Sequence, residues 1–275
     1  MNRLLPLFIL LAIALPQQAQ AGAWAQAQGK YYIKLSGISY SAKDHFNAEG
    51  DKQPLSPMDD RFNADQVFLY AEYGALNRLT ITAQGNWGEL VSKNTQGRNS
   101  TRGTGDWDIG VKYQSVDAPV VLAPYIGLKL PIVYDDSDNP SLGTGDIDIE
   151  AKLLAAKSLH PAPVYIGAEL GYRLRGGPFS NQIPYSFEVG VTPHKKLFIK
   201  TYLLGTNTLI GDSGFGPAMN SMSTQVSEGD FTKWGLSGAV QLHGPLWLDL
   251  LYETIFAGKN IGAGSSFGLG LSISR

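Results

Sequence analysis

A strict two-residue alternation of apolar and polar side chains constrains this chain more than any other feature. In Leu79-Thr80-Ile81-Thr82-Ala83-Gln84 every odd position is apolar and every even position is polar. The pattern returns in residues 106–113 and 146–153, where the polar positions are chiefly aspartate, glutamate and lysine. Successive side chains of a strand point to opposite faces, so each segment has one apolar face and one charged face. The pattern therefore predicts an all-β fold.

The N-terminal segment has the plan of a secretory signal peptide. Arg3 precedes an apolar run over residues 4–15, Pro16 ends that run, and Ala19-Gln20-Ala21 is a small-x-small cleavage site. The run is shorter than the roughly 20 residues that a spanning helix needs. We predict a signal peptide over residues 1–21 with cleavage after Ala21, and a single β-barrel domain over residues 22–275.

The alternating segments predict about twelve strands, an even number that outer-membrane barrels use. They cover residues 30–41, 64–74, 79–89, 105–115, 120–134, 145–157, 163–175, 183–193, 196–206, 230–243, 245–256 and 264–275. Each is close to or longer than the roughly 9–11 residues with which a tilted strand crosses a bilayer. With an even number of strands, both termini are expected on the same side.

The predicted connections alternate between short and long. The short ones are 74–78, 115–119, 158–163, 193–196 and 243–245, and the long ones are 42–63, 90–104, 135–144, 176–182, 207–229 and 257–263. Short periplasmic turns and long extracellular loops are typical of outer-membrane barrels. The alternation predicts an outer-membrane location with both termini in the periplasm.

Aromatic residues fall at the two ends of the apolar strand faces. Those expected beside long loops are Trp87, Trp107, Tyr172, Tyr185, Trp234, Tyr252 and Phe267, and those beside short turns are Tyr73 and Tyr113. Two aromatic girdles around an aliphatic band are typical of a lipid-facing surface. In hydrocarbon every backbone polar group must be paired, so the first strand must pair with the last. The expected fold is a closed, up-and-down, antiparallel transmembrane β-barrel, with outer-membrane lipid and the barrel-assembly machinery as partners.

Charged side chains occupy the opposite strand faces. They are Lys34, Glu72, Asp106, Asp108, Lys112, Lys129, Asp146, Asp148, Glu150, Lys152, Glu169, Arg173, Arg175, Glu188, Lys200, Lys233, Asp249 and Glu253. A lysine or arginine facing lipid at the midplane would cost about 2–4 kcal/mol, so we expect all of these residues to line the lumen. The acidic groups either form part of a selectivity ring or pair with cations in a salt-bridged lumen. Their spacing does not separate the two arrangements.

Several motifs resemble those of a known family. Residues 103–109 (Gly-Thr-Gly-Asp-Trp-Asp-Ile) match residues 143–149 (Gly-Thr-Gly-Asp-Ile-Asp-Ile). These strand openings, the Lys129-Leu130-Pro131 strand and the strand at residues 171–174 resemble the outer-membrane barrels of the MetA-pathway phenol-degradation family. The resemblance covers most of residues 103–205 and implies passive uptake of hydrophobic substrates, without catalytic residues to transfer. The chain differs from such barrels in ending on Arg275 rather than on an aromatic residue.

Composition narrows the function classes. The chain has no cysteine, which excludes thiol catalysis and cysteine-bound metal, and its net charge of −2 gives no reason to expect a nucleic-acid partner. Neither a cofactor nor a metal is expected. We predict a passive outer-membrane channel for small solutes, hydrophobic or aromatic ones among them. A non-conducting structural or adhesive barrel is the alternative. A surface lipid-modifying enzyme is the third hypothesis, for which His45, placed in a long loop, is the available base.

Overall fold

A computed structural model describes residues 22–55, 60–94, 97–134, 137–209 and 229–275. The predicted signal peptide, with Ala21, lies outside these ranges. The regular elements within them are all β-strands, as the alternation predicts. Within the same ranges no helix has the length and apolar character needed to cross a bilayer.

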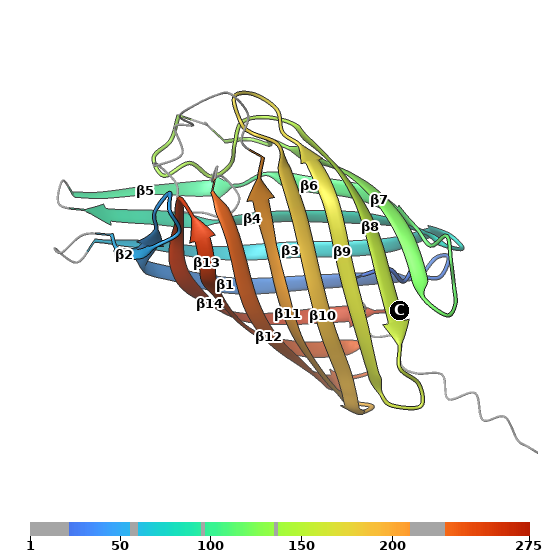
Figure 1. Cartoon of the computed structure of the whole chain (residues 1–275). Helices are drawn as coiled ribbons and strands as arrows, with labels where there is room; N and C mark the ends of the chain where they lie inside the picture. Colours follow the sequence, from blue (N-terminus) through green and yellow to red (C-terminus); the bar gives the residue numbers. More distant parts are fainter. Residues whose placement is uncertain (1–21, 56–59, 95–96, 135–136, 210–228) are drawn as a thin grey trace, which may run out of the picture.

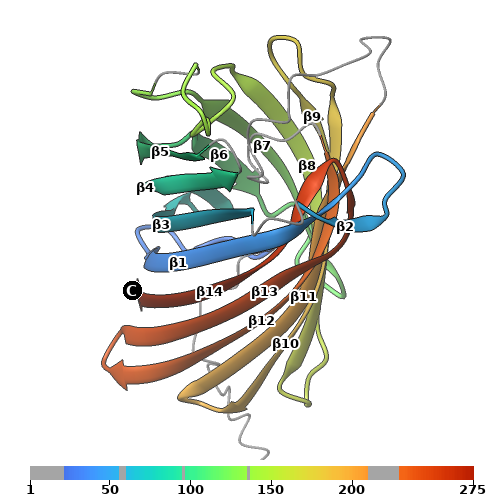
Figure 2. The same ribbon diagram turned by 90° about the vertical axis from the view of Figure 1, so that its left-hand side faces the viewer.

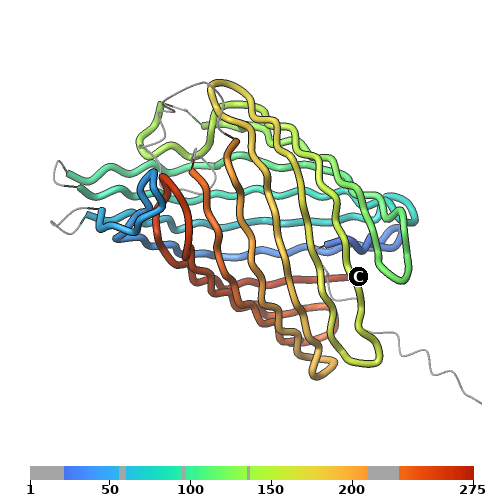
Figure 3. Tube along the Cα trace, in the orientation of Figure 1, coloured from blue at the N-terminus to red at the C-terminus, as the bar shows by residue number. Residues whose placement is uncertain are grey.

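Fourteen strands form one antiparallel sheet (Figure 1). They are β1 (Tyr31–Phe46), β2 (Lys52–Pro54), β3 (Arg61–Leu76), β4 (Leu79–Asn94), β5 (Gly97–Thr104), β6 (Trp107–Tyr113), β7 (Val121–Leu130), β8 (Asp148–Ser158), β9 (Val164–Leu174), β10 (Gln182–His194), β11 (Leu197–Thr208), β12 (Asp230–His243), β13 (Leu246–Lys259) and β14 (Ile261–Ser274). Figure 3 follows the chain from hairpin to hairpin around this sheet.

The sheet closes on itself. β1 pairs with β14 from Tyr32 opposite Ser274 to Phe46 opposite Ile261, with one irregularity after Ser41. Figure 2 shows the two strands side by side. Each of the other barrel strands pairs with its neighbours along the chain, so no barrel strand has a free edge. The prediction of a closed, up-and-down barrel of twelve strands is confirmed, with β2 and β5 as additional short strands.

β2 and β5 extend the wall at the end of the barrel where the predicted long loops lie. β2 pairs only with the last residues of β1, and β5 pairs with the second half of β4, whereas β6 pairs with its first half. In Figure 1 the β4–β5 hairpin projects beyond the rest of the barrel. The predicted loops 42–63 and 90–104 are therefore partly strand.

Three other predicted boundaries were wrong. The expected long loop 257–263 is a tight turn, because β13 and β14 are separated only by Asn260, whose φ of 51° suits asparagine. The strand expected over 120–134 ends at Leu130. The strand expected from residue 145 begins at Asp148, because residues 140–144 are buried inside the barrel instead of continuing the strand.

The outer surface of the barrel is apolar and carries both aliphatic and aromatic side chains. Among its exposed side chains are Leu35, Leu69, Ile126, Leu170, Leu250 and Leu269. Trp234, Tyr252 and Phe267 form a chain of ring contacts across β12, β13 and β14, with centroids 6.0 and 5.0 Å apart. Tyr73 and Tyr113 are exposed at the short-turn end. An exposed apolar wall of this extent fits lipid rather than water.

Both ends of the barrel wall lie at the short-turn end. The backbone amides of Tyr31 and Arg275 each donate to the other residue's carbonyl at 3.0 Å. The amide of Gly29 donates to the carbonyl of Gly74, near the end of β3 that leads into the turn to β4. The chain therefore enters and leaves the barrel at one end.

Candidate functional site

The inner face of the barrel carries most of the charged residues that the alternation selects, and most of them contact an opposite charge. The pairs away from the β7–β9 wall are Lys34–Asp249 (3.2 Å), Lys112–Glu72 (3.0 Å), Lys200–Glu188 (2.9 Å) and Lys233–Glu253 (2.9 Å). Each of these pairs joins different strands. The lumen wall is thus crossed by hydrogen-bonded ion pairs rather than lined by isolated charges.

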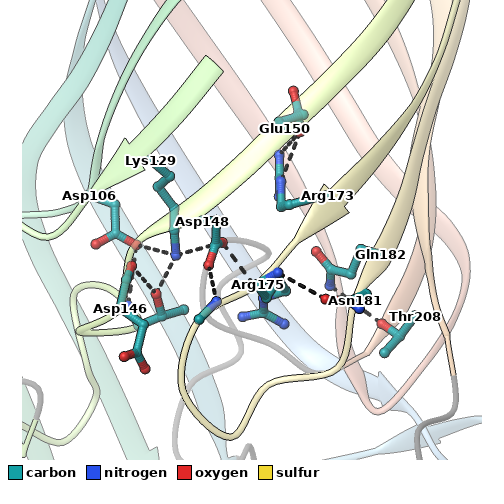
Figure 4. Close-up of polar contacts among 12 residues, drawn as sticks. Asp106, Lys129, Asp146, Asp148, Glu150, Arg173, Arg175, Asn181, Gln182 and Thr208 are labelled. Carbon is teal, nitrogen blue, oxygen red and sulfur yellow. Dashed lines mark hydrogen bonds and ion pairs between the residues drawn. The ribbon is translucent and has the colours of Figure 1, made fainter. Parts of the chain in front are cut away.

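The densest charged cluster surrounds Lys129 on β7 (Figure 4). Its ammonium lies 3.1 Å from a carboxylate oxygen of Asp106 and 2.9 Å from one of Asp148, and its side chain is 9% exposed. Asp106 is the fourth residue of the segment 103–109, and Asp148 is the sixth residue of the matching segment 143–149. The two carboxylates around this buried cation therefore come from non-equivalent positions of the two segments.

Further ion pairs continue this cluster along β8 and β9. The guanidinium of Arg173 contacts Glu150 through two nitrogens, at 2.5 and 2.8 Å, and Lys152 lies 2.8 Å from the same carboxylate. Lys152 is also 3.7 Å from Glu169, and Arg175 is 3.7 Å from Asp148. Asp106, Asp148 and Glu150 are each held by a cation, which is the arrangement of a salt-bridged lumen.

Two predicted residues stand apart from these pairs. Asp108 lies on β6 in register with Lys129 of β7. Asp146, expected on a strand, precedes β8. Its carboxylate lies against the backbone of Gly177, where an added Cβ would be 2.0 Å from an Asp146 oxygen.

The first described residues, 22–30, contact the inner wall at the short-turn end. Ala23 is fully buried among Val121, Ala123, Leu154 and Ala156, which belong to β7 and β8. The ring of Trp24 meets the edge of Tyr165 at a centroid distance of 5.4 Å. The sequence analysis did not predict this placement, because residues 22–29 precede the first predicted strand and carry no charged side chain.

Polar contacts fix the same segment to the charged wall. Lys112 donates to the carbonyl of Gly22 at 2.9 Å, and the Gln26 side chain donates to Glu72 at 2.7 Å. The amide of Gln26 also donates to the hydroxyl of Thr80. The N-terminal segment therefore narrows the lumen along β4, β6, β7 and β8.

A second inward segment narrows the long-loop end. Leu142 is buried against Phe62, Ala64 and Leu90 on β3 and β4. Its neighbour Thr144 is held by Asp106, whose carboxylate accepts the Thr144 amide at 3.2 Å. The Tyr134 hydroxyl donates to Asp106 and accepts the Gly145 amide. Sequence reasoning placed Leu142 and Thr144 in the long loop 135–144 and Tyr134 at the end of a strand, and it missed the inward packing of this segment.

Two cavities remain along the opposite wall, formed by β1, β3 and β11–β14. The cavity nearer the long loops has a volume of about 300 Å³ and is lined by Ile38, Tyr40, Phe62, Phe68, Lys233, Glu253 and Ile255, among others. The cavity nearer the short turns has about 210 Å³ and is lined by Tyr32, Tyr70, Phe198, Tyr202, Trp247 and Asp249, among others. Leu251 lines both cavities. Aromatic and aliphatic side chains line both cavities, and the ion pairs of Lys34, Lys200 and Lys233 border them.

The enzyme hypothesis relied on His45 as a base in a long loop. His45 lies within β1 rather than in a long loop, which corrects its expected place. In the part of the chain that the structure describes, no three histidine, aspartate or glutamate side chains are grouped as a metal site would require.

A closed twelve-stranded barrel with a lipid-compatible exterior and a charged lumen defines the fold of an outer-membrane channel or porin. The structure is similar to an outer-membrane channel from Pseudomonas putida F1, with a TM-score of 0.72 at 14% identity over 94% of this chain and all of that one. It is also similar to the NanC porin (TM-score 0.55, 10% identity, 88% and 98% of the two chains) and the KdgM porin (0.52, 6%, 89% and 99%). No protein-family model matches the sequence, and neither does any curated protein. At these identities the similarity establishes the fold.

Proposed function

We propose that this protein is a passive outer-membrane channel for small, largely uncharged solutes, aromatic ones in particular. The observation that carries the proposal is the pair of lumen cavities, which share Leu251 and in which aromatic and aliphatic side chains lie beside lysine, carboxylate and hydroxyl groups. A lining that combines aromatic rings with placed polar groups suits a small ring compound carrying one or two hydroxyls.

The ion pairs support a preference for neutral solutes. Lys34, Lys200 and Lys233 border these cavities, and each is already paired with a carboxylate. A charged solute would have to break such a pair and leave its partner unpaired in a poorly hydrated site. A neutral aromatic solute meets no such cost.

The proposal also includes the orientation of the barrel in the outer membrane and its route of insertion. The short-turn end, with both ends of the barrel wall, faces the periplasm, and residues 1–21 act as a signal peptide removed after Ala21. The assembly machinery inserts the barrel. Membership of the MetA-pathway phenol-degradation family is part of this proposal, supported by the motifs around Asp106 and Asp148 and by the fold similarity to an outer-membrane channel.

Single-barrel current in a planar bilayer tests the proposal. We expect a small ionic current that a neutral aromatic alcohol such as 4-methylphenol reduces and that glucose at the same concentration leaves unchanged. Trp247→Ala, in the cavity nearer the short turns, should weaken the reduction of current by 4-methylphenol. Trp234→Ala, on the outer surface, should not change that reduction. A correctly folded barrel that carries no current would refute the channel.

A non-conducting structural or adhesive barrel is the second candidate. The observation that favours it is the narrowing of the lumen from both ends, by residues 22–30 and by the segment around Leu142. The absence of current from a folded barrel would select this function.

A further inference from the structure

Residues 22–27, which we call the N-terminal segment, turn back into the barrel ahead of β1. The amide of Lys30 donates to the carbonyl of Ala27 at 2.9 Å and closes the turn, in which Gly29 has a φ of 75° that favours glycine. β1 itself begins at Tyr31 and is held by β3 and β14 along its length. The segment can therefore swing at this turn while the barrel wall stays closed.

The inner wall leaves room for the backbone of this segment. A Cβ added to Gly74, near the end of β3, would lie 2.1 Å from the carbonyl oxygen of Ala27 and 2.8 Å from that of Gln26. Any residue other than glycine would collide with the segment, although the φ of Gly74 is not positive and the strand alone does not demand glycine there. Ala23 is fully buried among side chains that include two alanines. The wall is thus shaped to receive these residues.

Side chains of the wall also satisfy backbone groups of the segment. The amide of Ala25 donates to the side-chain oxygen of Gln114 at 2.8 Å. The amide of Gln26 donates to the hydroxyl of Thr80 at 2.8 Å, and Thr80 is fully buried, so this hydroxyl meets the segment rather than water. Together with the contact from Lys112 described above, these bonds fix the position of the segment residue by residue.

The segment also lies beside the cavity nearer the short turns. Trp24 meets Tyr165, whose ring stacks on that of Phe198 at a centroid distance of 6.2 Å and an interplanar angle of 4°. Phe198 lines this cavity, and so does Lys200, which pairs with Glu188. The contacts of the segment and the lining of the cavity therefore share one part of the wall.

Gly22 lies beside the carboxylate of Glu188 on β10. A Cβ added to Gly22 would be 3.7 Å from Oε1 of Glu188. Hydrolysis of the bond between Ala21 and Gly22 takes the new carboxylate oxygen of Ala21 from water and leaves the Gly22 nitrogen as a free ammonium. Rotation about the Cα–C bond of Gly22 then carries this nitrogen to the position of the added Cβ, because the two bonds to Cα are nearly equal in length. At that position the ammonium and the carboxylate are within ion-pair distance.

Glu188 has room for this additional donor. Its Oε1 accepts the hydroxyl of Tyr165 and its Oε2 accepts the ammonium of Lys200, each at 2.9 Å, and a carboxylate offers about four acceptor positions. Glu150 in the same lumen shows that one carboxylate can hold two cations. The eighteen charged residues expected in the lumen are ten carboxylates and eight cations, so one more cation reduces the net negative charge there.

We propose that the short-turn end of the lumen is a binding site for the mature N-terminus of the same chain, and that the docked segment closes the passage. The ligand is the Gly22 ammonium with the backbone that follows it, and Glu188 is its counter-ion. This inference rests on the proposed function, because it needs cleavage after Ala21 and a passage to close. Release of the segment opens the cavity nearer the short turns toward the periplasm.

Amide hydrogen exchange of the mature barrel in detergent, read by mass spectrometry on a peptide covering residues 22–30, tests the docking. A barrel with a free Gly22 amine is compared with one acetylated at Gly22 before refolding, each with and without Glu188→Gln. Acetylation removes the charge, so it should speed exchange of the Ala25 and Gln26 amides on the order of fivefold. In Glu188→Gln, acetylation should have no further effect. The matched control is Glu253→Gln, which breaks the pair with Lys233 beside the other cavity and should keep the full response to acetylation.

Single-barrel current tests whether the segment closes the passage. Gly74→Val puts a side chain where the Ala27 carbonyl lies, so it should displace the segment and raise the current. Deletion of residues 22–27 should raise the current to the same level, and Gly74→Val should add nothing in the shortened chain. Gly37→Val adds the same side chain to the outer face of β1, where an added Cβ would be 4.0 Å from the Leu269 oxygen, and should leave the current unchanged.

The two measurements fail separately. Equal exchange in the free and acetylated barrels would overturn the docking of the ammonium at Glu188. An unchanged current after deletion of the segment, in a barrel that conducts, would overturn its role in closure. Absence of current from every variant would refute the channel, whereas the exchange measurement needs no current and still decides the docking.

Discussion

The buried pair Lys112–Glu72 gives the sharpest prediction about stability. Its two side chains are 3% and 0% exposed, and their charged atoms are 3.0 Å apart. Lys112 also donates to the carbonyl of Gly22, so Lys112→Met removes two contacts and leaves a buried carboxylate without its cation. Breaking a buried pair in this way typically costs 3–5 kcal/mol of unfolding free energy.

The remaining partners of Glu72 set the expected value within that range. The hydroxyl of Tyr70 donates to its carboxylate at 2.6 Å and the side chain of Gln26 donates at 2.7 Å. These neutral donors keep the carboxylate partly satisfied, so we expect Lys112→Met to cost about 3 kcal/mol, near the lower limit. Lys112→Met/Glu72→Gln should recover part of this loss, because no buried charge then remains.

Urea unfolding of the detergent-solubilised barrel, followed by tryptophan emission, measures these differences. The control is Asp117→Asn, which breaks the exposed pair of Asp117 with Arg78 and should cost no more than about 1 kcal/mol. If Lys112→Met cost as little as Asp117→Asn, Lys112 and Glu72 would not form a buried pair, and the salt-bridged lumen would be wrong.

Three further predictions follow from the lumen and the wall. Leu251→Ala should widen the junction between the two cavities and raise single-barrel current, whereas Leu250→Ala, the next residue and outward-facing, should leave the current unchanged. Tyr134→Phe removes the hydrogen bonds with Asp106 and Gly145, so the segment around Leu142 should become more susceptible to added protease; equal cleavage of both proteins would contradict that anchoring. Leu35→Lys places a cation on the lipid face of β1 and should cost up to about 2–4 kcal/mol in unfolding experiments in lipid, whereas Ser41→Lys, beyond the apolar band, should cost less.

Period-two alternation predicts the wall of this barrel because it records which side of each strand meets lipid. It assigns Lys129, Glu150 and Arg173 to one face, and closure follows from the need to pair every backbone group in hydrocarbon. It does not predict which charges meet, because Lys129 and Asp148 come together through the register of β7 and β8, and Asp106 reaches Lys129 from the residues between β5 and β6. The alternation also underestimates strand length where β4 and β5 extend beyond the bilayer. Side chains there do not contact lipid, so their outward positions need not be apolar.

The contents of the lumen were not predictable in the same way. Ala23 and Leu142 lie outside the predicted strands, and they are placed by packing against residues more than 50 positions away. Short apolar and glycine-containing segments have the composition of ordinary loops. Their position is set only by contacts with the folded barrel wall, which the local sequence does not show. The tight turn at Asn260 was predicted as a long loop, because the residues around it include several glycines and long loops share that composition.

Single-cysteine labelling along β13 tests the central claim most directly, because the natural chain has no cysteine to interfere. A fluorophore would be attached in turn at positions 248 to 253 of the barrel reconstituted in vesicles containing brominated lipid. The account predicts strong quenching by lipid at Leu248, Leu250 and Tyr252, and weak quenching at Asp249, Leu251 and Glu253, whose side chains face the lumen. Quenching that does not alternate along the strand would contradict a barrel with lipid outside and a passage within.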